Sequence, residues 1–146
     1  MLRCPLSCIM NKIEITPLNK GYKSEIRKIS ALARKIFLLL KKDGYSADIY
    51  LADNQTMRKI NRIYRKKDKS TNVLSFCEPV DFVRAPSRYE YLGEIYIGVD
   101  YIRAHKQDFS LMVAHSILHL FGYDHETTKD RVKMEKKEAS LLVRVQ

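Results

Sequence analysis

Three of the chain's four histidines lie within HSILHLFGYDH, residues 115–125. His115 and His119 are four residues apart in a helix-forming stretch, so both side chains project from one face of a helix. Gly122 follows, and glycine is the residue that most often ends a helix in a left-handed turn. Such a turn reverses the chain and brings His125 back towards the first two histidines. The spacing therefore predicts three imidazoles that converge on one point.

Three neutral imidazoles form a ligand set for zinc. Each nitrogen binds the ion at about 2.0–2.1 Å, and a fourth position stays open for water, which is typical of a catalytic site. Bound zinc lowers the pKa of that water to roughly 7. We therefore predict one Zn²⁺ per chain at His115, His119 and His125, although imidazole sites also accept nickel, copper and iron. The weaker alternative is that the histidines are core residues without a metal.

One large class of zinc proteases has the same spacing, H-E-x-x-H-x-x-G-x-x-H, with the glutamate as general base. Here the position of that glutamate is Ser116, whose hydroxyl is a poor base at neutral pH. The pattern therefore favours a metal site and disfavours peptide hydrolysis. Asp124 is a candidate catalytic residue that orients a ligand ring or a water. An equally supported alternative is that Asp124 caps a helix beginning near Glu126.

A basic segment, NRIYRKKDKSTNVLSF, covers residues 61–76. Arg65 can hold a phosphate through two parallel hydrogen bonds, whereas Lys66, Lys67 and Lys69 act as mobile point charges. The whole chain carries a formal charge of +10, which favours a polyanionic partner and nucleic acid first. Taken alone, however, such a run of charges is more often a solvated turn.

The hydrophobic periodicity predicts the elements that position these residues. Alternation of polar and apolar residues predicts strands at 11–17, 47–53, 70–76 and 92–100. Helical periodicity predicts helices at about 23–42, 55–65, 101–107, 110–121 and 126–143. The elements interleave without strict βαβ repetition. We predict a single α+β domain with a small mixed sheet of about four strands and about five surrounding helices.

Two local packing predictions follow from the same patterns. The helix at 55–65 is expected to begin after a cap by Asp53 or Asn54. Its inward-facing residues are expected to be Met57, Ile60, Ile63 and Tyr64. Cys77 is expected to be a small packed side chain.

The ends and the composition suggest one domain in a reducing compartment. Residues 1–9 are predicted to be a flexible N-terminal extension, with Met10 as a candidate start and residues 10–146 as the domain. No apolar run approaches the roughly 20 residues of a membrane helix, so no membrane partner is expected. The three cysteines show no disulfide framework, which predicts a cytoplasmic location.

Taken together, NRIYRKKDKSTNVLSF, LGEIYIG and HSILHLFGYDH resemble the YbeY family of metal-dependent endoribonucleases. The likeness spans nearly all of the chain from Met10, and the family fold is a mixed sheet with surrounding helices. The resemblance implies hydrolysis of single-stranded RNA in 16S rRNA 3′-end maturation and ribosome quality control, with ribosomal subunits as partners. It also implies that the three histidines bind zinc and that Arg65 is the functional arginine beside them.

The chain departs from the commonest family pattern at a few positions, none of which is an implied ligand. Ser116 stands where glycine is usual, Glu94 where aspartate is usual, and Ser70 and Cys77 where prolines are frequent. Glu94 has two equally supported interpretations, a carboxylate close to the metal and an exposed strand residue.

Three questions about the mechanism and function stay open at this point. The general base can be the metal-activated water, Asp124 or the 2′-hydroxyl of the RNA. The alternative functions are a zinc metallopeptidase-like hydrolase and a non-catalytic, metal-stabilised ribosome-binding factor. The sequence does not predict the oligomeric state.

Overall fold

The computed structural model describes residues 10–145 of the chain. The predicted N-terminal extension, residues 1–9, lies outside the described residues. Within residues 10–145, four strands form one sheet in the order β1-β2-β4-β3. They are β1 (Lys12–Pro17), β2 (Tyr45–Ala52), β3 (Val73–Cys77) and β4 (Glu90–Gly98). The pairs β1–β2 and β2–β4 are parallel and β3 is antiparallel to β4, so the predicted mixed sheet is confirmed.

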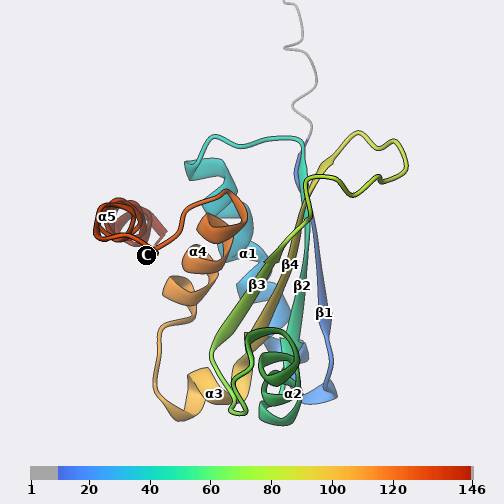
Figure 1. Cartoon of the computed structure of the whole chain (residues 1–146), viewed down its shortest axis with the longest axis vertical. Helices are drawn as coiled ribbons and strands as arrows, with labels where there is room; N and C mark the ends of the chain where they lie inside the picture. Colours follow the sequence, from blue (N-terminus) through green and yellow to red (C-terminus); the bar gives the residue numbers. More distant parts are fainter. Residues whose placement is uncertain (1–9, 146) are drawn as a thin grey trace, which may run out of the picture.

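Five α-helices and one short 3₁₀ helix (Lys20–Tyr22) surround the sheet in the same range of residues. The α-helices are α1 (Lys23–Leu39), α2 (Asn54–Arg65), α3 (Val99–Ala104), α4 (Phe109–Leu120) and α5 (Thr128–Val145). Helices α1, α4 and α5 lie on one side of the sheet, whereas α2 lies on the other side near one end (Figure 1). The predicted α+β fold with about five helices is therefore confirmed.

Strand alternation divides the apolar residues between the two sides of the sheet. Ile49 in β2 and Ile95 in β4 belong to the main core with α1, α4 and α5. Tyr96, the next residue in β4, contacts a smaller cluster that contains Met57 of α2. Because α2 covers just one end of this second face, the second cluster is small. The main core therefore anchors α4, the helix that carries two of the histidines.

Helix α2 buries a narrower stripe than its periodicity predicts. Asp53 caps the helix as expected, accepting a hydrogen bond from the Thr56 backbone N–H at 2.8 Å. Met57 is fully buried, but Ile63 and Tyr64 are 47% and 65% exposed, so the prediction that they face inward is wrong. The helix extends past the part of the sheet that it covers, and its last turn therefore has its apolar residues in solvent.

Two further observations concern the exposure of Cys77 and the apolar character of the helices. Cys77 is exposed at the end of edge strand β3, so the prediction that it is packed is wrong. Among residues 10–145, no helix combines the length and the apolar character that crossing a membrane requires.

Candidate active site

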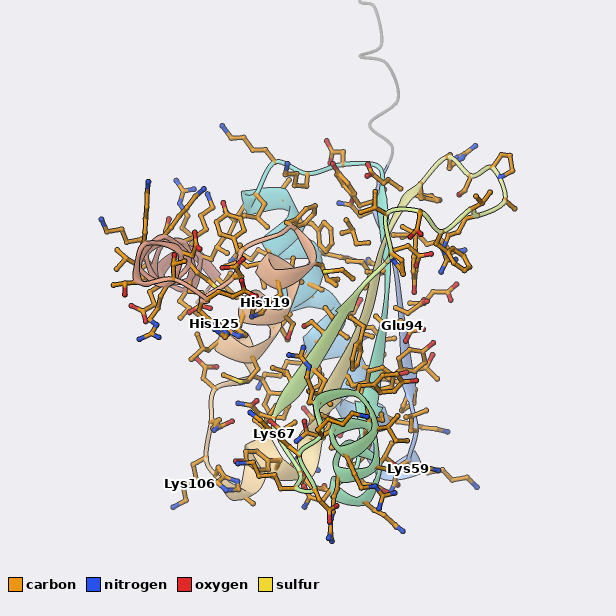
Figure 2. All side chains as sticks on the ribbon, viewed as in Figure 1. Lys59, Lys67, Glu94, Lys106, His119 and His125 are labelled. Atoms are coloured by element: carbon orange, nitrogen blue, oxygen red, sulfur yellow. The ribbon has the colours of Figure 1, made fainter. Side chains whose placement is uncertain are left out.

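His115, His119 and His125 form a compact group, called here the histidine centre. The first two lie on α4, and the Nε2 atoms of His115 and His119 are 3.1 Å apart. Gly122 has a φ of 91°, and its N–H donates to the His119 carbonyl at 3.0 Å, which ends the helix in the predicted left-handed turn. His125 then returns to the group, with its ring centroid 5.2 Å from that of His119 (Figure 2). One nitrogen from each ring lies within 4.8 Å of the others.

The donor set of the histidine centre fits a divalent metal ion. Two nitrogens bound to tetrahedral zinc at 2.0–2.1 Å are separated by roughly 3.3 Å. The measured 3.1 Å between the Nε2 atoms of His115 and His119 is close to that separation. The three histidines could therefore hold a metal ion, and imidazole ligands alone do not specify which one.

The electrostatic environment keeps His119 neutral. Burial is the main cause that lowers its pKa to about 4, and the nearby charges of His115, His125 and Arg65 lower it further. A hydrogen bond with the backbone of Tyr123 acts in the opposite direction. At neutral pH the imidazole therefore carries an unprotonated nitrogen, which is the form that binds a metal.

Glu138 of α5 holds the ring of His115. Its Oε1 lies 2.5 Å from Nδ1 of His115, and the carboxylate side chain is 14% exposed. A carboxylate at Nδ1 keeps the proton on that nitrogen, so the lone pair on Nε2 faces the other two histidines. The arrangement is the one that supports metal-binding histidines in proteins.

The sequence analysis missed Glu138, although the register of α5 contains a signal. Glu138 follows Met134 by four residues and precedes Leu141 by three, and both of these residues are buried. Residues at these separations share one face of a helix. A carboxylate on the buried face of an otherwise charged helix therefore indicates a specific partner, which here is His115.

The histidine centre opens into a cleft of about 620 Å³, called here the basic cleft. The lining also includes β3, Arg65 at the end of α2, and Lys67 and Lys69 of the turn that follows. The Nη2 atom of Arg65 donates to the Ser75 carbonyl at 3.4 Å. The charged wall and the imidazole wall thus face a common volume, in which an anion can contact both.

Asn61 determines how the basic turn lies beside the cleft. This side chain is 3% exposed, and its amide donates to the carbonyl of Lys69 at 2.8 Å. The backbone carbonyl of Asn61 accepts from the N–H of Lys67 at 3.3 Å. The side chain and the backbone of one buried residue thus hold two points of the short turn, which restricts its path.

Lys66 and Asp124, the remaining two residues predicted for the site, differ in whether they line the basic cleft. Lys66 does not line the basic cleft; it ends α2 with a φ of 60°, and its Nζ donates to the Ile63 carbonyl at 3.3 Å. Asp124 does line the cleft, and its Oδ1 accepts from the N–H of Glu126 at 3.2 Å.

Asp124 does not take its alternative role, which is the cap at the start of α5. The helix begins at Thr128, and Thr127 Oγ1 accepts from the N–H of Asp130 at 3.1 Å. The Thr127 hydroxyl also donates to the Asp130 carboxylate at 2.6 Å, so these two residues are joined twice at the start of the helix. Asp124 instead stabilises the turn that leads from His125 into the helix.

Residues 8–146 match the family model described as Endoribonuclease YbeY. The chain belongs to the YbeY family. Endoribonuclease YbeY of Persephonella marina is 34% identical over 134 residues, which cover 86% of each chain. Endoribonuclease YbeY of Ehrlichia canis is 34% identical over 144 residues, covering 89% of this chain and 90% of the relative. The solution structure of TM1509 from Thermotoga maritima matches with a TM-score of 0.58 and 25% identity, covering 91% of this chain and 88% of that one.

Membership in the YbeY family confirms the resemblance, and the structure shows where this chain's departures lie. Ser116 is buried and its hydroxyl donates to the Met112 carbonyl at 2.7 Å, so it offers no base to the basic cleft. Cys77 lines the cleft, and its thiol donates to the His119 carbonyl at 3.5 Å. Glu94 lies on the far side of the sheet from the histidines, where it accepts from the Tyr96 hydroxyl at 3.2 Å (Figure 2).

Proposed function

We propose that this protein is a zinc-dependent endoribonuclease that hydrolyses phosphodiester bonds of single-stranded RNA in the basic cleft. The observation that carries the proposal is that the histidine centre and the Arg65 guanidinium line the same cleft. Membership in the YbeY family and the net charge of +10 support RNA as the substrate class.

The histidine centre, Glu138 and Arg65 have proposed roles in the hydrolysis. A Zn²⁺ ion at the histidine centre would supply a Lewis acid and an activated water at neutral pH. Glu138 keeps the proton of His115 on Nδ1. Arg65 donates to the non-bridging oxygens of the scissile phosphate and stabilises the charge that develops there.

The flanking charges bind the rest of the RNA strand. Lys67 and Lys69, inside the cleft, contact the neighbouring phosphates, and Lys66 contributes from outside it. Asp124, which lines the cleft beside His125, orients the attacking water or accepts its proton. The buried Ser116 hydroxyl donates to the Met112 carbonyl and is not available for this role.

The cellular role that we propose is 16S rRNA 3′-end maturation and ribosome quality control in the cytoplasm. The partners are then single-stranded rRNA and ribosomal subunits. This part of the proposal is supported by family membership and by the basic residues that line the cleft. We assign the activity to residues 10–146 as a single domain.

The experiment that tests the proposal combines metal analysis with an RNA cleavage assay. Purified protein is assayed on an end-labelled single-stranded RNA, with chelator and after return of Zn²⁺, beside the His119→Ala and Arg65→Ala variants. We expect cleavage that requires metal, and loss of cleavage in both variants. Product ends identify the nucleophile, since attack by the 2′-hydroxyl leaves a cyclic phosphate whereas attack by water leaves a linear one.

Three results would contradict the proposal. Cleavage of a peptide library that His119→Ala abolishes would support the metallopeptidase alternative. Stoichiometric metal without any RNA cleavage would support a metal-stabilised binding factor. RNA cleavage that persists in His119→Ala with chelator would show that the histidine centre is not the active site.

A further inference from the structure

An aromatic pair, the exposed Tyr64 and the half-buried Phe76, lies beside the basic cleft. The ring of Tyr64 in α2 is centred 5.2 Å from that of Phe76 in β3, at an angle of 60°. The guanidinium carbon of Arg65 lies 6.0 Å from the centroid of Phe76. The proposed phosphate-binding residue is thus adjacent in sequence to one of these rings and close in space to the other.

Burial does not account for the position of Tyr64. The residue is 65% exposed, and its neighbour Ile63 is 47% exposed. A large aromatic ring in solvent gains little from the hydrophobic effect, and its exposed surface is available for a ligand. Exposed aromatic side chains next to cations are the usual platforms on which unpaired bases stack.

Strand β3 holds the aromatic pair at the point where a bound RNA strand would leave the basic cleft. It is an edge strand, in which Ser75 and Cys77 line the basic cleft while Phe76 packs on the other side against Tyr96. The hydrogen bond from Arg65 to the Ser75 carbonyl holds the guanidinium at that edge. A polynucleotide with one phosphate at Arg65 would therefore have a neighbouring base within reach of Tyr64 at the edge of the sheet.

Charge limits how far such a platform extends. The aromatic row continues from Phe76 to Tyr96 and on to Tyr50, whose ring is stacked 4.9 Å from that of Tyr96. Glu94 bonds to Tyr96, and the register pairs Glu94 with Asp48 of β2, so two carboxylates lie at this end of the row. They repel phosphates, so the usable part of the row is Tyr64 with Phe76 beside it.

We propose that Tyr64, supported by Phe76, is a stacking subsite for the unpaired base next to the phosphate that Arg65 binds. This inference rests on the proposed function and adds a physical reason for a preference for single strands. A base inside a duplex has both faces covered by its neighbours, so it stacks on Tyr64 only after it is unpaired.

The test measures RNA binding under chelator, so that cleavage does not interfere. Tyr64→Ala is compared with wild type, Tyr64→Phe and Phe82→Ala, where Phe82 is a 59% exposed aromatic of the β3–β4 loop. We expect Tyr64→Ala to bind single-stranded RNA roughly 5- to 100-fold more weakly, the range of one base–aromatic contact. Tyr64→Phe and Phe82→Ala should bind single-stranded RNA like wild type. All four proteins should bind duplex RNA with the same affinity.

Fluorescence can report the stacking of a base at position 64, because the chain contains no tryptophan. In Tyr64→Trp the new indole is the sole tryptophan, and stacking of a base should quench its fluorescence as single-stranded RNA saturates the protein. Thermal unfolding checks that each variant remains folded, as expected for an exposed position.

The outcomes separate this inference from the proposed function. If wild type neither binds nor cleaves RNA, both are overturned. If wild type cleaves RNA while Tyr64→Ala binds equally tightly, or the Tyr64→Trp fluorescence does not respond to saturating RNA, the stacking subsite alone is overturned. Equal losses for single-stranded and duplex RNA would also overturn it.

Discussion

The Oε1 atom of Glu138 lies 2.5 Å from Nδ1 of His115, so α5 fixes the orientation of a ring that α4 carries. The contact joins residues 23 positions apart in the sequence. It links the last helix of the chain to the chemistry of the histidine centre, and its contribution can be measured through metal affinity.

Replacing Glu138 should weaken metal binding without unfolding the protein. We expect Glu138→Ala to lose about 10- to 100-fold in Zn²⁺ affinity, as is usual when the carboxylate behind a metal-binding histidine is removed. Glu138→Gln should lose less, because its amide oxygen can still accept from Nδ1. Competition with a chromogenic chelator measures the affinities, and Glu14→Gln, an exposed carboxylate of β1, is the control. Unchanged affinity in Glu138→Ala would contradict the role.

Replacing Arg65 should separate cleavage from metal binding. Arg65→Ala is expected to lower the cleavage rate by about 10²- to 10³-fold, the usual cost of removing one donor to a developing negative charge. Arg65→Lys should recover part of the rate, since it keeps the charge but not the paired donors. Metal content should match wild type in both variants. Arg62→Ala, on the same helix and exposed, is the control and should cleave normally. Normal cleavage by Arg65→Ala would refute the assignment.

The lysines of the basic turn should be visible in the salt dependence of RNA binding. Each phosphate contact with a single strand adds about 0.7 to the slope of log K against log salt concentration. We expect Lys67→Ala and Lys69→Ala each to reduce the slope by about that amount. Lys66→Ala should reduce it less, because Lys66 does not line the basic cleft. A slope that none of the three variants changes would place the RNA elsewhere on the surface.

Acid should destabilise the metal-free protein through His119. Its pKa is lowered from 6.5 to about 4 in the folded state, mainly by burial. Between these values the unfolded chain binds a proton that the folded protein does not, so stability falls as the pH is lowered through this window. Thermal unfolding of chelator-treated protein should show a steeper loss between about pH 6.5 and about pH 4 in wild type than in His119→Asn. Parallel curves for the two proteins would contradict the expectation, and the exposed His105→Asn serves as control.

Local patterns sufficed for most of the fold. The alternation in β2 and β4 and the helical periodicity of α1 and α4 predicted elements within a few residues of their observed bounds. The convergence of the histidines was also predictable, because the separation of His115 and His119 on one helix and the turn at Gly122 involve neighbouring residues alone. Nothing outside that short stretch is needed to bring the three rings together.

Predictions failed where a residue's environment depends on distant segments. Ile63 and Tyr64 have the spacing of buried residues, yet α2 extends past the sheet that would cover them. Cys77 has the small apolar side chain of a core residue but lies exposed at the end of an edge strand. In both cases the periodicity predicted the helix or strand correctly. It did not show where the neighbouring elements that would cover these residues end.

The amino-acid sequence by itself determined the family, the mixed sheet and the spacing of three imidazoles, since these follow from motifs and from periodicities of a few residues. The tertiary structure alone decided that Glu138 supports His115, that Arg65 lines the same cleft as the histidines, and that Glu94 lies on the opposite side of the sheet. These relationships join elements far apart in the chain. They depend on the order of the strands and on which face each helix covers, and neither is encoded in the local spacing of residues.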